Sequence, residues 1–327
     1  MKLATLADGS RDGALAVVSH DGKGYVDALS VAPTMQDALE RWGEVAAPLR
    51  ELAARLEAGQ IKGQPMSEAV ILAPLPRAWQ WLDGSAFASH GELMDKVLGI
   101  NPEKTGRPLM YQGVSNQFYA PTDDVVMASE SDGIDFEGEF GVIVDETPMG
   151  VSPDEAMKHI RLLVQINDWS LRALAGPEMK TGFGWVQAKP PCSMAPFAVT
   201  PDELGPAWRD GRIHLNLRVD WNGERFGNAH GGPMGHGFHE LVAHAARTRT
   251  LCAGTVIGSG TVSNETYREV GSSCIAERRG IEIVDIGEPR TAFMKYGDQV
   301  RMEARDADGL LLFGAIDQRV VAPGAQS

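Results

Sequence analysis

Residues 135–144 read Asp-Phe-Glu-Gly-Glu-Phe-Gly-Val-Ile-Val, a run that predicts a β-strand carrying two glutamates. Side chains two apart on a strand share a face, with their Cα atoms about 6.6 Å apart, so Glu137 and Glu139 can point at one ion. Gly138 between them leaves the opposite face small, which suits close packing or a bend. Paired, partly buried carboxylates repel one another without a cation, so the pattern favours an oxygen-preferring metal such as Mg²⁺, Mn²⁺ or Ca²⁺.

Two segments downstream of the glutamates add to this hypothesis. The stretch Gln165–Ser170 places Asp168 among apolar neighbours, and Gln187–Pro191 holds Lys189 before two prolines in a stiff loop. Lys189 can balance the carboxylates or bind a substrate oxygen. Each feature also has an ordinary explanation, with the two glutamates on a solvated strand face, Asp168 in an Asx turn and Lys189 exposed. The individual motifs are weak, and only their combination favours a site.

The first part of the chain predicts a small module of hairpins and one helix. Asp-Gly pairs separate three short apolar runs, a pattern typical of tight hairpins. The runs are Leu3–Ala7, Ala14–Ser19 and Gly24–Ala28. Apolar residues then recur every three or four positions over Met35–Leu56, which indicates a helix that ends before Gly59. Because 327 residues exceed the usual size of one hydrophobic core, we expect this module over residues 1–75 and a second domain over residues 76–327.

The second domain is predicted to mix strands with a few helices. Ser152 and Pro153 supply an N-cap and a first-turn proline, and the apolar spacing that follows predicts a helix ending near Asn167. Alternating apolar residues over Ile213–Trp221, followed by Asn222-Gly223, predict a strand and a hairpin. Further expected elements are a helix over His239–Arg247, strands over Thr255–Ser263 and Gly271–Ala276, and a strand pair around the turn Tyr296–Asp298.

The composition narrows the class of protein. Hydrophobic residues make up 43% and charged residues 23% of the chain, as in ordinary globular proteins. Thirty basic against 44 acidic side chains give a formal charge of -14, which repels a phosphate backbone, so we expect no nucleic-acid partner. No apolar stretch is long enough to span a bilayer, the N-terminus turns polar at Asp8-Gly9, and the three cysteines lack metal or redox spacing. These features predict a cytoplasmic protein with reduced core thiols and no membrane association.

Taken together, the motifs resemble the signature of the fumarylacetoacetate hydrolase family, in particular its larger fumarylacetoacetase-type members. The resemblance covers roughly Leu82 to Val320 and rests on the order and spacing of several segments. These are Glu137-x-Glu139, Asn167–Ser170, Lys189 and Gly258–Thr261. The resemblance implies an α+β, mostly β fold, in which a mixed β-sheet roll follows the small N-terminal β/α module. It also implies one divalent cation (Mg²⁺, Mn²⁺ or Ca²⁺) per subunit, a homodimer, and a keto or diketo acid as substrate.

The resemblance also assigns roles to individual residues. Asp83 and His90 have the separation of a fourth acidic ligand and a histidine base in the larger members. The implied metal ligands are Asp83, Glu137, Glu139 and Asp168, and the implied catalytic residues are His90 and Lys189. Tyr111 resembles a tyrosine that contacts substrate, and Thr261 resembles a threonine that contacts the substrate carboxylate. Lys189 is a further expected substrate contact.

Three positions depart from the pattern of the larger members. Ser85 stands where they have a substrate-contacting tyrosine, Ala175 where they have a glutamine, and Ile275 where they have the acid that partners the histidine. Glu277 lies two residues after Ile275 and on the same face of an expected strand, so we take it as the replacement catalytic acid. These departures leave the metal site intact but weaken the case for fumarylacetoacetate itself as substrate.

Three functions are compatible with these residues. The first is a hydrolase that cleaves a carbon–carbon bond of a fumarylacetoacetate-like or acylpyruvate-like diketo acid in aromatic-compound catabolism, with water activated by His90 and a metal-stabilised enolate as leaving group. The second is a keto-acid lyase, either an oxaloacetate-type decarboxylase or a 2-keto-4-pentenoate-type hydratase, because the same enolate chemistry serves those reactions. The third is a non-catalytic, metal-stabilised oligomer. The combination of acids, histidine and lysine favours the first.

Overall fold

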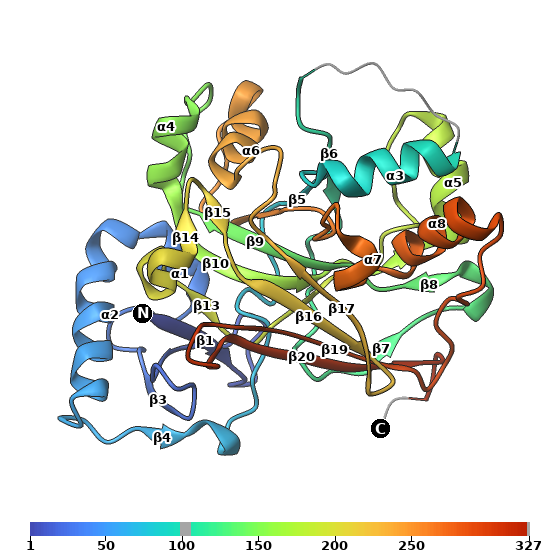
Figure 1. Cartoon of the computed structure of the whole chain (residues 1–327). Coiled ribbons are helices and arrows are strands. Elements are labelled where there is room, and N and C mark those ends of the chain that lie inside the picture. Colours follow the sequence, from blue (N-terminus) through green and yellow to red (C-terminus); the bar gives the residue numbers. More distant parts are fainter. Residues whose placement is uncertain (99–105, 326–327) are drawn as a thin grey trace.

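The computed structural model describes residues 1–98 and 106–325, and its helices and strands are labelled in Figure 1. The strands in the first half of the chain are β1 (Lys2–Leu6), β2 (Ala14–Val18), β3 (Gly24–Asp27), β4 (Gln64–Pro65), β5 (Trp81–Gly84), β6 (Met110–Gly113), β7 (Val125–Val126), β8 (Ile134–Asp135), β9 (Gly138–Val144) and β10 (Ile160–Asn167). Those in the second half are β11 (Ser170–Leu171), β12 (Ser193–Met194), β13 (Ala198–Val199), β14 (Trp208–Arg209), β15 (Arg212–Ile213), β16 (Asn216–Trp221), β17 (Glu224–His230), β18 (Thr255–Gly258), β19 (Gln299–Arg305) and β20 (Leu311–Val321).

Helices are fewer and mostly short. The α-helices are α1 (Met35–Glu40), α2 (Trp42–Glu57), α3 (Ala88–Leu98), α4 (Pro153–Ala156), α5 (Arg172–Thr181), α6 (Phe238–Ala245), α7 (Tyr267–Val270) and α8 (Ile275–Ile286). The 3-10 helices are η1 (Met66–Glu68), η2 (Glu130–Asp132), η3 (Met157–His159), η4 (Pro201–Ala207) and η5 (Ala246–Thr248).

Two large sheets form the framework of the described residues. The larger has the strand order β4-β3-β2-β1-β13-β10-β9-β18-β5-β6, with β12 also paired to β10, and the second has the order β17-β16-β19-β20-β7. Most neighbours are antiparallel, but β18 pairs with β5 and β20 with β7 in parallel, so both sheets are mixed. The predicted α+β class, with mixed sheets and a small N-terminal module, is confirmed.

The N-terminal elements join the larger sheet directly. Strand β1 pairs with β2 on one side and with β13 on the other, where Lys2 lies opposite Val199. The helical spacing over Met35–Leu56 yields two helices, because α1 ends and α2 begins at Arg41. Both helices lie beside the first strands at the lower left of Figure 1. The division of the chain after residue 75 stays a prediction.

The helix predicted from Ser152 to Asn167 is wrong for most of its length. Helix α4 makes a single turn and η3 follows it, after which Ile160–Asn167 form strand β10. This strand lies between β9 and β13 and is buried at almost every position. A strand buried on both faces needs apolar residues at successive positions, so it lacks the alternation of a half-buried strand and its pattern can match helical spacing.

Two other expected strands also differ. The extended segment predicted over Gly271–Ala276 stops at Cys274, which caps helix α8, so Glu277 lies in the first turn of a helix. Near the C-terminus, the strand pair is β19 and β20, and the turn at Tyr296–Asp298 precedes both. The hairpin after Ile213–Trp221 and the helix near His239–Arg247 are confirmed as β16–β17 and α6.

Two further expectations concern the cysteines and the membrane. Cys192 and Cys274 are buried and all three cysteines are free, but Cys252 is exposed and so is no core residue. Within residues 1–98 and 106–325, no helix has both the length and the apolar character needed to cross a membrane.

Helices α3 and α8 pack against each other at the upper right of Figure 1. A close backbone contact lies just before α8, where Gly227 of β17 forms a bridge with Gly271. A Cβ on Gly227 would lie 2.1 Å from the backbone oxygen of Ser272. The segment that leads into α8 can therefore pack this closely only against a glycine.

We predict that Gly227→Ala lowers the free energy of unfolding by more than about 2 kcal/mol, because a clash with backbone cannot be relieved by a side-chain rotamer. Gly43→Ala is the control, since nothing lies within 4 Å of a methyl group added at that position in α2. This control should stabilise the protein by roughly 0.5–1 kcal/mol. Urea unfolding measures both, and equal stability of the two variants would contradict the contact's importance.

Candidate metal and catalytic centre

Three buried carboxylates converge from neighbouring strands of the larger sheet. Asp83 lies near the end of β5, Glu139 lies on β9, and Asp168 directly follows β10. One carboxylate oxygen of each residue lies within 4.8 Å of those of the other two. Among the residues that the structure describes, this is the one group of three or more His, Cys, Asp or Glu side chains with the spacing of a metal site. We call it the carboxylate triad.

Strand β18 separates β9 from β5, and its last residue makes room for the carboxylate triad. A Cβ on Gly258 would lie 2.3 Å from Asp83 Oδ1 and 2.9 Å from Glu139 Oε2. Two residues later, the backbone N–H of Gly260 donates to Asp83 Oδ1 at 3.1 Å. The predicted Gly258–Thr261 segment therefore lies against the triad. Thr261 is buried there, and its contact with substrate stays a prediction.

Burial raises the pKa of each acid in the triad. It raises the pKa of Glu139 and of Asp83 well above the ordinary range, and the neighbouring carboxylates raise both further. Burial also raises the pKa of Asp168, although the ammonium group of Lys189 opposes this shift. In the absence of a further positive charge, the triad therefore holds protons more tightly than exposed carboxylates do.

Glu139 shows what kind of group the triad can accept. Its side chain is fully buried, yet neither carboxylate oxygen has a hydrogen-bond partner among the described residues. A buried, ionised carboxylate without a partner costs on the order of several kcal/mol. A divalent cation that prefers oxygen ligands would satisfy these oxygens and offset the negative charge. The residues present thus fit Mg²⁺, Mn²⁺ or Ca²⁺.

Glu137 differs from Glu139 although the two are adjacent on one face. Its Oε2 accepts a hydrogen bond from Lys189 Nζ at 2.8 Å, and its Oε1 accepts one from Arg172. Burial would raise the pKa of Glu137, but Arg172 and Lys189 outweigh that effect and hold its pKa below the ordinary range. Glu137 lies outside the triad, and its assignment as a metal ligand stays a prediction.

Lys189 connects Glu137 to the triad. Besides Glu137, its Nζ donates to Asp168 Oδ2 at 2.5 Å. Burial lowers the pKa of Lys189, but Asp168 and Glu137 overcome this and raise its pKa above the ordinary range. The lysine is therefore a buried, permanently charged ammonium group, and it is brought into the centre as predicted.

Three other side chains complete the surroundings of the acids. Tyr111, on β6 opposite Asp83, donates its hydroxyl to Asp168 Oδ2 at 2.7 Å. Cys192 Sγ donates to Asp168 Oδ1 at 2.9 Å, and Arg172 Nε donates to Asp135 at 2.8 Å. Sequence reasoning missed Cys192 and Arg172. An isolated charge in the apolar run of residues 171–175 was the available signal for Arg172, and no signal pointed to Cys192.

The predicted histidine and its partner acid meet between α3 and α8. His90 Nδ1 lies 3.6 Å from Glu277 Oε1, and Glu277 is fully buried. Ser263 donates its hydroxyl to the same Glu277 oxygen, and Ser89 donates to Ser263 at 2.9 Å. Among the described residues, His90 Nδ1 and Glu277 Oε2 have no hydrogen-bond partner. The fold thus brings the two residues together, with Glu277 on a helix instead of the expected strand.

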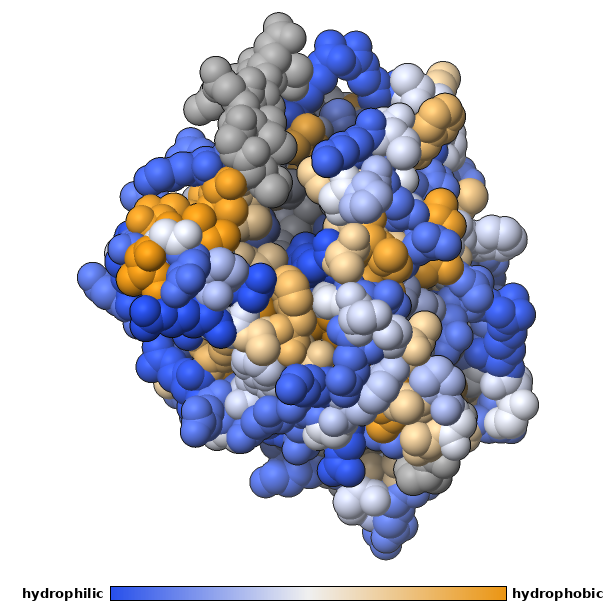
Figure 2. Space-filling model, turned by 90° about the vertical axis from the view of Figure 1, so that its right-hand side faces the viewer, coloured by the Kyte–Doolittle hydropathy of each residue, from blue (hydrophilic) through white to orange (hydrophobic). Residues whose placement is uncertain are grey.

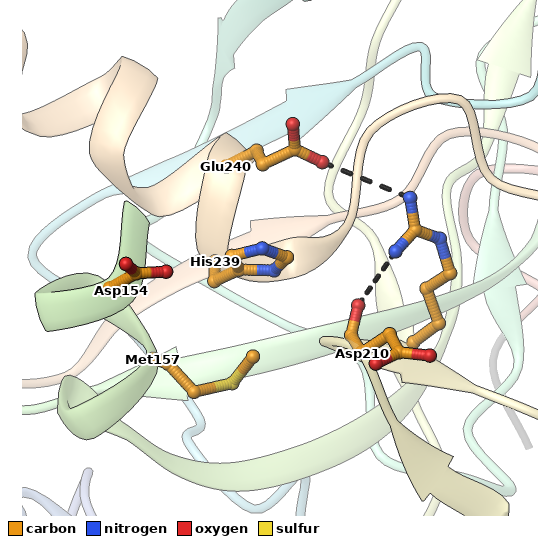
Figure 3. A pocket seen from close by; sticks show the side chains of 6 residues that line it. Asp154, Met157, Asp210, His239 and Glu240 are labelled. Atoms are coloured by element: carbon orange, nitrogen blue, oxygen red, sulfur yellow. Dashed lines mark hydrogen bonds and ion pairs between the residues drawn. The ribbon is translucent and has the colours of Figure 1, made fainter. Parts of the chain in front are cut away.

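A cavity of about 430 Å³ lies elsewhere, between α4, α6 and the β14–β15 turn (Figure 3). Its charged lining is largely self-paired, since Arg212 donates to the backbone oxygen of Asp210 at 2.7 Å and lies 3.8 Å from Glu240 Oε2. None of the predicted site residues lines it. The candidate site is therefore the buried triad and its surroundings.

The mixed sheets and the buried triad beside a histidine–glutamate pair define a class of enzymes with a carboxylate metal site. The family described as fumarylacetoacetate (FAA) hydrolase C-terminal matches residues 80–321, and the family described as fumarylacetoacetase N-terminal domain 2 matches residues 1–77. The chain belongs to the fumarylacetoacetate hydrolase family, as its motifs indicated.

Relatives within this family carry out different reactions. The chain is 31% identical over 170 residues to 2,4-didehydro-3-deoxy-L-rhamnonate hydrolase of Sphingomonas sp. (strain SKA58), a match that spans 51% of this chain and only 57% of that enzyme. It is 22% identical over 300 residues to mitochondrial oxaloacetate tautomerase FAHD2A of Homo sapiens, covering 89% and 84% of the two chains. The solved structure of maleylpyruvate hydrolase from Sphingobium sp. SYK-6 with manganese (II) ion and pyruvate superposes with a TM-score of 0.67 at 16% identity, covering 98% and 99%. That likeness shows a shared fold.

We predict that Mg²⁺ or Mn²⁺ raises the melting temperature of the protein at pH 7.5 and that Glu139→Gln removes most of this effect. A ligand at 100 times its Kd stabilises the folded state by about 2.7 kcal/mol, which corresponds to several degrees. Glutamine keeps the shape of Glu139 but removes the charge that the cation would offset. Thermal unfolding with added metal and with EDTA measures the difference, and equal metal effects in the two proteins would contradict the assignment.

The same experiment has a pH dependence of known sign. The folded-state pKa of Glu139 is raised, so the folded metal-free protein keeps a proton that the unfolded chain releases. The stability of the metal-free wild type should therefore fall, relative to Glu139→Gln, as pH rises from about 4 toward neutrality. In EDTA the variant should melt higher than wild type at pH 7.5 and close to it at pH 4.5. If the difference in melting temperature between wild type and Glu139→Gln does not change with pH, the pKa of Glu139 is not raised in the folded protein.

Proposed function

We propose that this protein is a divalent-metal-dependent hydrolase that cleaves a carbon–carbon bond of a diketo acid, of the acylpyruvate or fumarylacetoacetate-like type. The observation that carries this proposal is the carboxylate triad, with the unpartnered oxygens of Glu139, together with the pair of His90 and Glu277. Asp83, Glu139 and Asp168 would hold the cation. When bound, it supplies a Lewis acid for the substrate carbonyl and a positive charge that favours an anionic substrate in an acidic protein.

His90 is the proposed general base. Glu277 lies on the Nδ1 side of the ring, so a proton held at Nδ1 leaves Nε2 to accept a proton from water. The water oxygen then bonds to the carbonyl carbon, and the neighbouring carbon–carbon bond breaks. Its electron pair leaves with the departing carbon as an enolate, which is protonated to a ketone. Lys189, a fixed ammonium group beside Asp168, stabilises the negative oxygen that develops.

Two named relatives support hydrolysis. The rhamnonate-derived substrate of the Sphingomonas enzyme and the maleylpyruvate of the Sphingobium enzyme are both hydrolysed by proteins similar to this chain, and the latter structure contains manganese and pyruvate. Ser85 and Ala175 still argue against fumarylacetoacetate itself. A homodimer and a cytoplasmic role in aromatic-compound catabolism belong to the same proposal.

Tautomerisation of an oxaloacetate-like keto acid is the second candidate. It is favoured by the match to the human tautomerase, which spans 89% of this chain. Moving a proton between carbon and oxygen needs a base such as His90 and stabilisation of an enolate, but no water. The decarboxylase and hydratase alternatives need the same parts. These reactions therefore use the same residues of the site and differ in their products.

A panel of acylpyruvates, fumarylacetoacetate and oxaloacetate, incubated with the Mg²⁺- or Mn²⁺-supplied protein, separates these functions by mass spectrometry and by enol absorbance. We expect an acylpyruvate to yield pyruvate and a carboxylic acid. His90→Ala should slow this cleavage by roughly 10²–10⁴-fold. Cleavage of no diketo acid, with fast enol–keto exchange of oxaloacetate, would replace the hydrolase by the tautomerase.

Metal affinity provides the control for these variants. His90→Ala should bind Mn²⁺ about as well as wild type, whereas Asp168→Ala should lose both Mn²⁺ binding and turnover, because it removes a member of the triad. Calorimetric titration with Mn²⁺ measures the metal affinity of each variant, and product formation measures its turnover. Full activity of His90→Ala would remove the histidine from the mechanism, and full metal occupancy of Asp168→Ala would remove the aspartate from the site.

A further inference from the structure

We propose that Asp135 is a positioning residue, which holds the first turn of α8, and with it Glu277, in place beside His90. The inference rests on the proposed function, since it takes Glu277 to assist His90 in the reaction. It adds to that site a residue to which neither the sequence motifs nor the family resemblance assigned a role.

Asp135 caps α8 from a distant part of the chain. Its Oδ1 accepts a hydrogen bond from the backbone N–H of Ile275 at 2.7 Å, and its Oδ2 accepts one from that of Ala276 at 2.9 Å. These are the first two residues of the helix, and N–H groups in a first turn have no partner within their own helix. The local cap is Cys274, whose Sγ accepts from the N–H of Glu277 at 3.3 Å but is a weak acceptor. Asp135 is therefore the stronger cap.

The surroundings of Asp135 suit a carboxylate. A helix N-terminus carries a partial positive charge, and Arg172 Nε donates to the same Asp135 Oδ2 at 2.8 Å. Burial raises the pKa of Asp135, whereas Arg172 and the N–H of Ile275 lower it. The three donors are complementary to the ionised form of the side chain. Each contact thus depends on the two acceptor oxygens of this residue.

Water cannot take the place of these partners. Strand β8, which ends at Asp135, and helix α8 lie at the right of Figure 1, and Figure 2 shows that side of the molecule as a polar surface with apolar patches. Asp135 contributes nothing to the molecular surface, because its side chain is 0% exposed. A change at this position must therefore be compensated by protein groups or by movement of the helix turn.

The same carboxylate joins α8 to the acids of the centre through a chain of opposite charges. Arg172 donates to Asp135 with Nε and to Glu137 with a terminal nitrogen. Lys189 in turn donates to Glu137 at 2.8 Å and to Asp168 at 2.5 Å. The sign of the charge alternates along this chain, which consists of Asp135, Arg172, Glu137, Lys189 and Asp168. It connects the first turn of α8 with a member of the carboxylate triad.

Backbone contacts hold the segment before α8 independently of Asp135. The N–H of Gly138 donates to the backbone oxygen of Ser273 at 2.9 Å, and Glu137 forms a bridge with Cys274. We therefore expect the protein to fold without the charge of Asp135, but with a less tightly held first turn. Glu277 is the third residue of that helix, so movement of the turn changes its distance from His90.

Asp135→Asn tests this role, because asparagine keeps the shape but replaces one acceptor oxygen by an NH₂ donor. In the Mn²⁺-supplied protein, kcat for the keto acid that the wild type converts should fall about tenfold, since a small misplacement of a reacting group slows a reaction. KM and the Kd for Mn²⁺ should change less than about threefold, because the triad is retained. Steady-state kinetics and calorimetric titration measure these values.

Thr34→Ala is the matched control. The side chain of Thr34 caps α1, in the N-terminal module, by accepting from the N–H of Asp37 at 3.0 Å. Its loss removes a helix cap without touching the centre, so kcat should stay within about twofold of wild type.

Amide hydrogen exchange provides a second measurement, which needs no substrate. Asp135→Asn should speed the exchange of residues 275–277 about tenfold, because local opening of the first turn becomes easier. Thr34→Ala should leave the exchange of these residues unchanged.

If Asp135→Asn does not fold, Ile275→Pro and Ile275→Ala provide the test. Both remove the same buried side chain, but only proline also removes the N–H that donates to Asp135 Oδ1. Proline suits the first position of a helix, and Cys274 before it is extended, as a residue before proline must be. The proline variant should have about threefold lower kcat than the alanine variant, at equal KM.

The outcomes separate this inference from the proposed function. Unchanged kcat in Asp135→Asn would overturn the role of Asp135, and so would a parallel loss of kcat and Mn²⁺ affinity, which indicates general damage to the site. Unchanged exchange of residues 275–277 would overturn it as well. If the wild type converts no keto acid, the proposed function is contradicted, whereas faster exchange in Asp135→Asn still supports the anchoring of α8.

Discussion

Asp83, Glu139 and Asp168 hold three carboxylates within 4.8 Å of one another inside a β-sheet, and the repulsion between them is the constraint on which the site depends. The sheet can place them there because β10, β9, β18 and β5 are neighbours and because Gly258 leaves space above β18. Such an arrangement needs either bound protons or compensating positive charge. Lys189 supplies part of it, and the oxygens of Glu139, which have no hydrogen-bond partner among the described residues, form a candidate place for a divalent cation.

Glu137 and Glu139 show how tertiary contacts can place two similar residues in different electrostatic environments. Both are buried on β9 or at its edge, and both come from one Glu-x-Glu motif. Glu137 is ion-paired through both oxygens and stays charged, whereas Glu139 has no hydrogen-bond partner among the described residues and a raised pKa. Glu137 therefore binds the cationic side chains of Arg172 and Lys189, and Glu139 belongs to the candidate metal site. The motif itself cannot distinguish these roles, because they depend on residues far away in the sequence, such as Arg172 and Asp168.

The pair formed by His90 and Glu277 illustrates a second limit of local patterns. Glu277 was selected because a strand would have put it on the face of the position it replaces, yet it lies in the first turn of α8. It still lies 3.6 Å from His90, because helix α3, which carries His90, packs against α8. The local geometry was predicted wrongly although the two residues do lie close together, and the catalytic role of Glu277 stays a prediction. Strand β10 was predicted as a helix for a related reason. A strand buried on both faces lacks the alternation of apolar and polar residues by which a strand is recognised.

The sequence alone determined the family, the mixed-sheet class and the acids of the triad, because the order and spacing of Glu137, Glu139, Asp168 and Lys189 are properties of the chain itself. It also supplied the approximate positions of the hairpins and of α6, where turn residues and periodicity are local. Only the tertiary structure decided which acids are paired, that Arg172 and Cys192 adjoin the centre, and that Glu137 stands apart from the triad. These features arise from contacts between segments that are far apart in the sequence. Burial and charge act through space, so they produce no pattern that can be recognised in the sequence.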